Sequence, residues 1–399
     1  MRIQRRCSPI SSFPGKTATS QVVPRFLRKS DNPLFARVSP HFQPRIALYS
    51  GGKSAEALRR NIAVAHALKK SHLKANVLLI SEPHNDAALT PPKGLTCVGL
   101  PPSTEPGQLP QLALEALAGF KPDAVVVDDI PFGLKPELDA VISLLQRGNT
   151  RCILGLGDSP THTIPEQAQR LYDQIWAYGD RNLYDFAREY NFSNATRKKV
   201  HYTGYLDGQS LGQAGDQETT TEDLIVFTLG ESEDYANVCE TLITTPLPRN
   251  SKAILIAGPA MPSHVKNGLK QLAALQENFE VVNHGPGTAG LLARSSRIIA
   301  MGNNSTLSEA LASDRPTLLI PTRLRACHAL ERLARLNIAD VMSASDLSTK
   351  AISNWLCKDI PDNRPSSKQH VDFNGLTRLP GLLGTLLTSD RRQPSRQAF

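Results

Sequence analysis

A short loop between an apolar strand and a helix carries the residues best suited to bind an anion. The apolar run 297–300 predicts a strand, and a helical pattern begins a few residues later. The loop and helix start supply Gly302, Asn304, Ser305 and Thr306. A helix N-terminus presents backbone N–H groups without partners and the positive end of the helix dipole, so it attracts phosphate groups. This loop therefore predicts a site for the diphosphate of a nucleotide.

Glu309 lies one turn inside the same predicted helix. With a phosphate at the loop, its carboxylate would be within reach of the hydroxyl groups of a ribose. A helix start without any ligand is the alternative, because Thr306 and Glu309 have the spacing of a capping box, in which both side chains bond to backbone N–H groups. The residues alone leave both interpretations open.

Two more groups that could act on a substrate follow predicted strands in the first part of the chain. Asp158 ends the strand 152–156 on a glycine-rich turn, and a carboxylate there could be the general base for an acceptor hydroxyl. A turn-forming aspartate is the alternative. Gly51, Gly52 and Lys53 follow the first strand and could form a phosphate-binding nest at a helix start.

Short apolar runs alternate with helical patterns along the chain, and this alternation predicts the elements that position these residues. In the first half, the predicted strands are 46–49, 76–80, 124–127, 152–156 and 174–177. In the second half, they are 224–229, 253–256, 280–282, 297–300 and 317–320. Such an alternation is typical of a parallel sheet with helices on both faces. In a protein built from two such halves, ligands bind at the carboxyl ends of the strands.

The positive charge of the chain is confined to its N-terminal end. The 399 residues carry a formal net charge of +8, and residues 1–45 hold nine Lys and Arg against a single Asp. The remaining 36 basic and 36 acidic residues cancel, so charge gives no reason to expect a nucleic-acid partner. The basic segment lacks the apolar run of a secretory signal. It is interpreted as a disordered extension, with a basic surface tether or a targeting segment as alternatives.

Cysteine usage and hydropathy indicate a cytoplasmic protein. No run of about 18 apolar residues occurs, so no transmembrane helix is expected, although peripheral membrane contact is compatible with the basic end. The six cysteines are scattered and form no Cys-x-x-Cys pair. Thiols spaced in this way fit a reducing compartment better than a disulfide framework.

Several segments resemble a known family, and they occur in the right order. These segments are 121–131, 152–158, 175–180, 200–205 and 281–338. Their order resembles the GT-B family described as predicted glycosyltransferases, which is related to the N-acetylglucosaminyl transferase of peptidoglycan synthesis. The resemblance implies an α/β, GT-B-like fold with two Rossmann-type doubly wound parallel-sheet domains facing a cleft.

The resemblance, together with composition, implies how the chain is divided. Residues 1–44 form a basic, disordered extension, and 45–206 form an N-terminal Rossmann-like acceptor domain. The polar run 207–222 is the linker, 223–388 form the C-terminal Rossmann-like donor domain, and 389–399 form a polar tail.

The resemblance also implies roles for residues outside the helix-start loop. Gly230 would lie against the donor phosphates, His284 stands where the backbone contacts the nucleobase, and Arg325 stands where the donor sugar is contacted. No Asp-x-Asp pair ends a strand, which favours a site without a metal. Loop N–H groups and a cation such as Lys53 or Arg325 would then stabilise the diphosphate. A UDP-linked sugar would be the co-substrate, and no other cofactor is implied.

The leading hypothesis is a metal-independent glycosyltransferase that moves a sugar from a nucleoside diphosphate to an unidentified hydroxyl acceptor. Three loops depart from the family pattern. Glu56-Ala57 replaces a Gly-His pair, Glu231 stands in a glycine-rich loop, and Arg325-Ala326 replaces Glu-Gln. These departures support the alternative of a catalytically impaired scaffold that binds a ligand or a protein partner.

Overall fold

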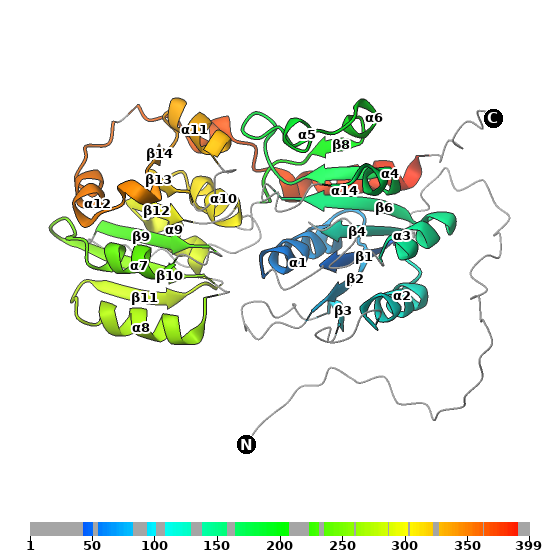
Figure 1. Ribbon diagram of the computed structural model, residues 1–399, viewed down its shortest axis with the longest axis horizontal. Helices are drawn as coiled ribbons and strands as arrows, with labels where there is room; N and C mark the ends of the chain where they lie inside the picture. The colour runs from blue at the N-terminus through cyan, green and yellow to red at the C-terminus, as the bar shows by residue number, and fades with distance from the viewer. Residues whose placement is uncertain are drawn as a thin grey trace, which may run out of the picture. The chain divides into compact units, whose positions relative to one another are not determined.

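The computed structural model describes most of the chain from residue 43 onward (Figure 1). The described ranges are 43–50, 55–82, 94–100, 108–128, 138–157, 164–206, 223–230, 235–258, 261–285, 287–301, 304–321, 327–361 and 363–389. The predicted linker 207–222 lies outside these ranges, as do residues 1–42 of the extension and 390–399 of the tail.

The first half of the chain is built on a seven-stranded parallel sheet with the order β3-β2-β1-β4-β6-β7-β8 (Figure 1). The order of the chain reverses at β1, which has β2 on one side and β4 on the other. The central strands are buried, which explains why they read as continuous apolar runs. The strands are β1 (Arg45–Ser50), β2 (Asn76–Ser81), β3 (Thr96–Gly99), β4 (Ala124–Asp128), β6 (Arg151–Leu156), β7 (Gln174–Ala177) and β8 (Val200–Tyr202).

The second half repeats this design with a six-stranded parallel sheet in the order β11-β10-β9-β12-β13-β14. Here the order reverses at β9, which pairs with β10 and β12. The strands are β9 (Asp223–Leu229), β10 (Ser251–Ala257), β11 (Phe279–Asn283), β12 (Arg297–Met301), β13 (Thr317–Ile320) and β14 (Asp340–Val341).

Helices connect the strands, as parallel neighbours require. In the first half they are α1 (Ala55–Lys70), α2 (Gln108–Phe120), α3 (Leu138–Arg147), α4 (Glu166–Leu171), α5 (Phe186–Glu189) and α6 (Asn194–Arg197). Later in the chain they are α7 (Tyr235–Ile243), α8 (Ser263–Ala273), α9 (Thr288–Arg294), α10 (Asn304–Ala312), α11 (Cys327–Arg335), the 3-10 turn η4 (Ala344–Asp346), α12 (Thr349–Leu356), α13 (Ser367–His370) and α14 (Gly375–Thr388).

Each strand predicted from the sequence is present, with ends within two residues of the prediction. The described residues contain three more, β3, β8 and β14, and each lies at the edge of its sheet. β14 has two residues, both exposed, and β3 is largely exposed. Edge strands of this kind bury little side-chain surface, so they lack the apolar run that identifies a central strand.

The last helix, α14, packs against the first half of the chain. Its residues Leu376, Leu379 and Leu383 lie in one buried cluster with Ile46 and Leu48 of β1. The same cluster includes apolar side chains of α1, which α14 contacts directly. The resemblance and the composition assigned residues 223–388 to the donor domain. The packing instead joins α14 to the sheet of the first half.

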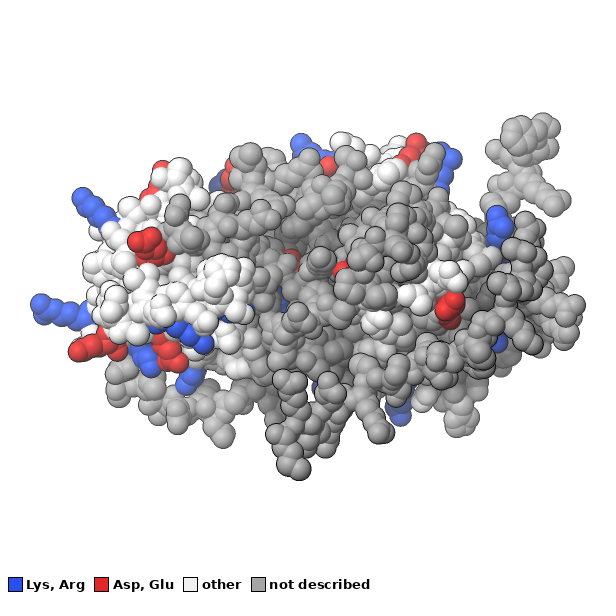
Figure 2. Space-filling view, turned by 60° about the horizontal axis from the view of Figure 1, so that its bottom comes forward, with Lys and Arg blue, Asp and Glu red and all other residues white. Residues whose placement is uncertain are grey.

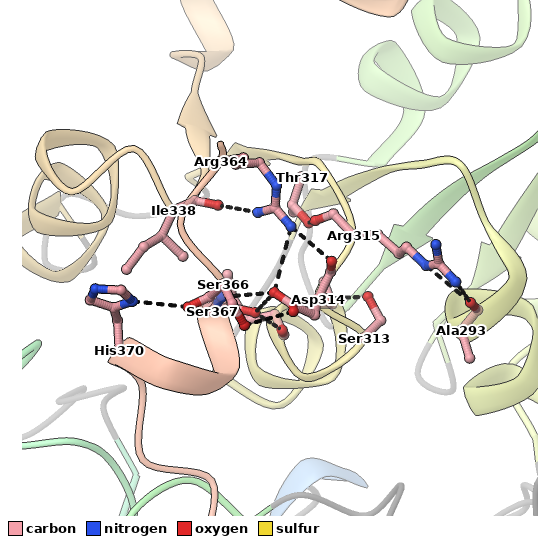
Figure 3. Close-up of polar contacts among 12 residues, drawn as sticks. Ala293, Ser313, Asp314, Arg315, Thr317, Ile338, Arg364, Ser366, Ser367 and His370 are labelled. Atoms are coloured by element: carbon pink, nitrogen blue, oxygen red, sulfur yellow. Dashed lines mark hydrogen bonds and ion pairs between the residues drawn. The ribbon is translucent and has the colours of Figure 1, made fainter. Parts of the chain in front are cut away.

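The carboxylate of Asp314 anchors the segment that leads to α14 (Figure 3). It accepts hydrogen bonds from the Ser366 hydroxyl (2.7 Å) and from the Ser367 backbone N–H (2.7 Å) and hydroxyl (2.9 Å). Arg364 donates to the backbone carbonyls of Asp314 (2.7 Å) and Ile338 (3.0 Å). Asp314 follows α10, so the end of α10 and the returning segment are fixed to each other.

The described surface mixes both signs of charge. Figure 2 shows Lys and Arg side chains interspersed with Asp and Glu side chains on the face in view. This pattern agrees with the equal numbers of basic and acidic residues after residue 45. Among the described residues, no helix has the length and apolar character that crossing a membrane requires.

Candidate functional site

The helix start predicted to bind phosphate follows the carboxyl end of a central strand. β12 lies between β9 and β13 and ends at Met301, and α10 begins at Asn304. The backbone N–H of Gly230, just beyond β9, donates to the carbonyl of Met301 across 2.7 Å, which holds the two strand ends together. The first turn of α10, which includes Ser305, therefore lies at the edge where α/β sheets bind ligands.

Thr306 does not occupy the capping position that the capping-box alternative requires. It is the third residue of α10, and its side chain is buried. A capping residue precedes the first helical residue, so Thr306 lies too far inside the helix for that role. Glu309 is one turn further along, and its carboxylate meets side chains from elsewhere in the chain.

Glu309 contacts a histidine and an arginine. His284 Nε2 lies 3.3 Å from Glu309 Oε2, and Arg59 Nη2 lies 3.8 Å from Glu309 Oε1. The guanidinium also lies against the imidazole, because Arg59 Nη1 is 2.9 Å from Nε2 and 3.3 Å from Nδ1 of His284. The side chains of the three residues are 15–22% exposed. The cluster is therefore largely shielded, but solvent still reaches it.

The environment of Glu309 keeps its carboxyl ionised. Burial by itself raises the pKa, but the nearby Arg59 guanidinium and the hydrogen bond and charge of His284 outweigh it, so the pKa is lowered from its ordinary value of 4.5. An ionised carboxylate only accepts hydrogen bonds. Its two oxygens are therefore suited to the two hydroxyl groups of a ribose once Arg59 and His284 give way.

His284 is placed by the end of β11 and by its neighbour β10. Its backbone N–H donates to the carbonyl of Ala257, the last residue of β10, across 3.1 Å. The next residue, Gly258, lies so close to β9 that a Cβ there would be 2.7 Å from the carbonyl oxygen of Leu229 and 2.8 Å from that of Gly230. The carboxyl ends of β9, β10 and β11 thus meet beside the start of α10.

A second polar cluster lies at the reversal point of the first sheet, and the sequence analysis missed it. Arg60 donates from Nη1 to Glu56 Oε1 (2.8 Å) and from Nε to Asp128 Oδ2 (3.3 Å). Asp128 ends β4 and is the register partner of Ser50, which ends β1. Arg60 and Glu56 are 8% exposed, and Asp128 is fully buried. The guanidinium also lies over the ring of Tyr178, 5.9 Å from its centroid.

The structure brings some of the predicted site residues together. Gly230, His284, Thr306 and Glu309 lie at the carboxyl edge of the second sheet, and Asn304 and Ser305 form the start of α10. The described ranges do not include Asp158, Gly51, Gly52, Lys53, Gly302 or Arg325. They also contain no group of three or more His, Cys, Asp or Glu side chains that could hold a metal ion.

Arg59 is the residue of this site that sequence reasoning did not find. It stands beside Arg60 on α1, shortly after the Glu56-Ala57 pair that departs from the family pattern. A signal for Arg60 was present, because Glu56 and Arg60 have the spacing of an ion pair on one helix face. No spacing in the sequence relates Arg59 to Glu309, because the two residues are 250 positions apart and lie on helices of different halves of the chain.

No protein-family model matches the chain. An uncharacterised glycosyltransferase of Methanosarcina mazei is 23% identical over 221 residues, which cover 52% of this chain and 56% of that protein. The match thus spans only about half the length of this curated relative.

Solved structures match a larger share of the chain. The Staphylococcus aureus MnaA–UDP co-structure superposes with a TM-score of 0.63 at 12% identity, over 89% of this chain and 100% of that one. Acinetobacter baumannii MurG superposes with a TM-score of 0.57 at 12% identity, over 86% of this chain and 99% of that one. The fold is GT-B-like, which confirms the fold class predicted from the sequence.

Proposed function

We propose that the protein is a glycosyltransferase that transfers a sugar from a UDP-linked donor to a hydroxyl acceptor without a metal ion. One observation carries the proposal: an ionised carboxylate, Glu309, lies one and a half turns into a helix that starts at the carboxyl edge of a parallel sheet. The helix start suits a diphosphate and the carboxylate suits a ribose. The likeness to an uncharacterised glycosyltransferase and to a UDP co-structure supports this donor class.

The donor would lie along the edge formed by β9, β11 and β12. The N–H groups of the α10 start, with Gly302, would bind the diphosphate, and Ser305 would donate to it. Gly230 would allow a close approach of the phosphates, and the backbone beside His284 would contact the base. The resemblance to the family puts Arg325 at the position that contacts the donor sugar. In this arrangement residues 223–374 bind the donor, and the acceptor binds to the first half of the chain.

The reaction exchanges one C–O bond for another. The acceptor oxygen forms a bond to the anomeric carbon and loses its proton to a base, for which Asp158 is the candidate. The bond between the anomeric carbon and the β-phosphate oxygen breaks, and its electron pair stays on that oxygen as UDP leaves. Fixed N–H groups stabilise the negative charge that develops there, because they need not reorient during the step.

A ligand-binding scaffold without transferase activity is the second candidate. It is favoured by the contacts of Glu309, whose two oxygens face Arg59 and His284. A ribose must displace at least one of them, and displacement lowers affinity. The substitutions at Glu231 and Arg325 point the same way.

A ligand panel separates a nucleotide-sugar enzyme from a scaffold. The melting curve of the protein is measured with UDP-, GDP- and TDP-linked sugars and with the free nucleotides. A ligand at 100 times its Kd stabilises a protein by about 2.7 kcal/mol, which gives a clear shift of the melting temperature. UDP compounds should shift the curve, and a donor should then be consumed when a hydroxyl acceptor is supplied. If no nucleotide shifts the curve at millimolar concentration, the transferase proposal fails.

A further inference from the structure

One helix carries two adjacent arginines with different partners. Arg60 points into the protein and is bound to Glu56 and Asp128 beneath the surface. Arg59 is 18% exposed and reaches His284 and Glu309, which lie in the second half of the chain, after β11 and on α10. The buried bonds of Arg60 fix this part of α1, so Arg59 can change partner without moving the helix.

The pair between Arg59 and Glu309 is loose. The shortest distance between guanidinium and carboxylate is 3.8 Å, which is longer than a hydrogen bond. Glu309 Oε2 lies closer to His284 Nε2, at 3.3 Å. A ribose hydroxyl that donates to Oε1 at ordinary distance would therefore replace a long-range attraction with a hydrogen bond. Arg59 would then lose its only described carboxylate neighbour.

The diphosphate would offer Arg59 a new partner nearby. Glu309 is five residues beyond Asn304, so it lies roughly 7.5 Å along the axis from the helix start at 1.5 Å per residue. An arginine side chain spans a similar length and ends in a planar fork that matches phosphate oxygens. A rotamer change can thus carry the guanidinium from Glu309 to a diphosphate at the start of α10.

Electrostatics favours the exchange of partners. The start of α10 is the positive end of a helix dipole, so a guanidinium moves toward it only when an anion is bound there. Without nucleotide, the charge of Arg59 is balanced by the carboxylate of Glu309. Arg59 and His284 lower the pKa of that carboxyl group. With a nucleoside diphosphate bound, the ribose occupies Glu309 and the diphosphate balances Arg59.

Resting on the proposed function, we propose that Arg59 is a catalytic residue that pairs with Glu309 in the empty protein and with the diphosphate in the nucleotide complex. The leaving group would then be stabilised by a cation from α1 of the first half, whereas the second half holds the nucleotide. The site would select nucleoside diphosphates over nucleosides and monophosphates, since a nucleoside offers a partner to Glu309 alone and a monophosphate lacks the β-phosphate oxygens that Arg59 would bind.

The test compares ligands that differ only in phosphate number. Dissociation constants for uridine, UMP and UDP are measured by calorimetry on the full chain and on Arg59→Gln, Arg59→Lys and Arg170→Gln. Arg170 is the matched control, because it is an exposed helical arginine paired with Glu166 four residues before it. Circular dichroism and melting curves check that each variant is folded.

Arg59→Gln should lower the ratio of the uridine Kd to the UDP Kd by roughly tenfold or more, as expected for loss of a bond to a charged group. Its affinity for uridine should stay the same or rise, because Glu309 has lost a competitor. Arg59→Lys should keep part of the UDP preference, and Arg170→Gln should keep all of it. If Arg59 had only a structural role, Arg59→Gln would weaken the binding of uridine and of UDP by the same factor.

The outcomes separate the two proposals. If the wild type binds UDP and Arg59→Gln keeps the full ratio, Arg59 does not bind the diphosphate and this inference is overturned while the transferase proposal stands. If the wild type binds none of the three ligands, the proposed function fails and the role of Arg59 fails with it.

Discussion

Arg60 donates from Nε to Asp128 Oδ2 across 3.3 Å, and this bond ties α1 to the end of β4. The strand that ends at Asp128 is one neighbour of β1 at the point where the sheet order reverses. Successive residues of a helix point about 100° apart, so fixing Arg60 inward also sets the direction of Arg59. The structural role of one arginine thus positions the proposed ligand contact of the next.

Replacing Arg60 should destabilise the protein strongly. Arg60→Met removes a buried cation that lies against two buried carboxylates, Glu56 and Asp128. Leaving a buried charge without its partner costs about 3–5 kcal/mol. Urea unfolding measures the loss, with Arg170→Met as the control, because an exposed pair contributes about 1 kcal/mol or less. Equal losses of unfolding free energy in the two variants would show that the buried cluster stabilises the fold no more than an exposed ion pair does.

Glu309→Gln should weaken nucleotide binding more than it weakens the fold. The amide keeps the size of the side chain. It has one acceptor oxygen instead of two and carries no negative charge, so it binds the two ribose hydroxyls less tightly. The expected loss of UDP affinity is about 1.5–3 kcal/mol, as for hydrogen bonds to a charged group. Calorimetry gives the affinity, and Glu331→Gln on the exposed face of α11 is the control. Unchanged UDP affinity in Glu309→Gln would remove the ribose contact from the proposal.

Stability should fall in acid partly through Asp314. Burial alone raises its pKa, but hydrogen bonds from Ser366 and Ser367 and the charge of Arg364 outweigh it, so the pKa lies below its ordinary value of 3.8. A carboxyl with a lowered folded pKa stabilises the fold fully above its unfolded pKa. That contribution is lost as pH falls below about 4 and through the folded pKa.

The variant Asp314→Asn isolates this effect. Asp314 has a positive φ of 58°, a conformation that asparagine also tolerates, so the backbone is not strained by the change. The unfolding free energies of wild type and variant should differ at pH 7 and converge as pH falls below about 4. A difference that does not depend on pH would show that ionisation of Asp314 is not what anchors the returning segment.

The core face of α14 should be essential to the first sheet. Leu383 is fully buried in the cluster with β1 and α1, so Leu383→Ala should cost about 2–5 kcal/mol. Leu275 is 81% exposed, and Leu275→Ala should change stability by less than about 0.5 kcal/mol. Urea unfolding compares the two. A small loss at Leu383 would mean that α14 is held loosely.

The sequence was most informative where the fold depends on local pattern. Central strands such as β9 are buried on both faces, so their apolar runs identify them without any knowledge of the rest of the chain. The loop between β12 and the next helix was predicted by the same reasoning, although α10 begins at Asn304, two residues before the Thr306 of the capping-box alternative. Glu309 entered the candidate site through its position on that helix.

Contacts between distant parts of the chain could not be read in this way. The spacing of charges on α1 indicates which residues share a helix face, but the partner of Arg59 depends on how the two sheets are arranged. The packing of α14 on β1 could not be predicted for the same reason. The apolar pattern of α14 shows that one face of the helix is buried, but it does not show against which sheet. Gly381 and Gly384 argue against a helix in this part of the sequence, yet both lie within α14.

The packing of α14 also bears on the order in which the protein can fold during synthesis. The apolar face of β1 and α1 leaves the ribosome well before the helix that covers it is synthesised. At roughly 5–20 residues per second, the stretch between Leu206 and Gly375 takes on the order of ten to thirty seconds to translate. For that time the nascent first sheet exposes a strip of apolar side chains. The native fold of the first sheet is completed only after α14 has been synthesised, and until then the strip is a target for chaperones and for aggregation.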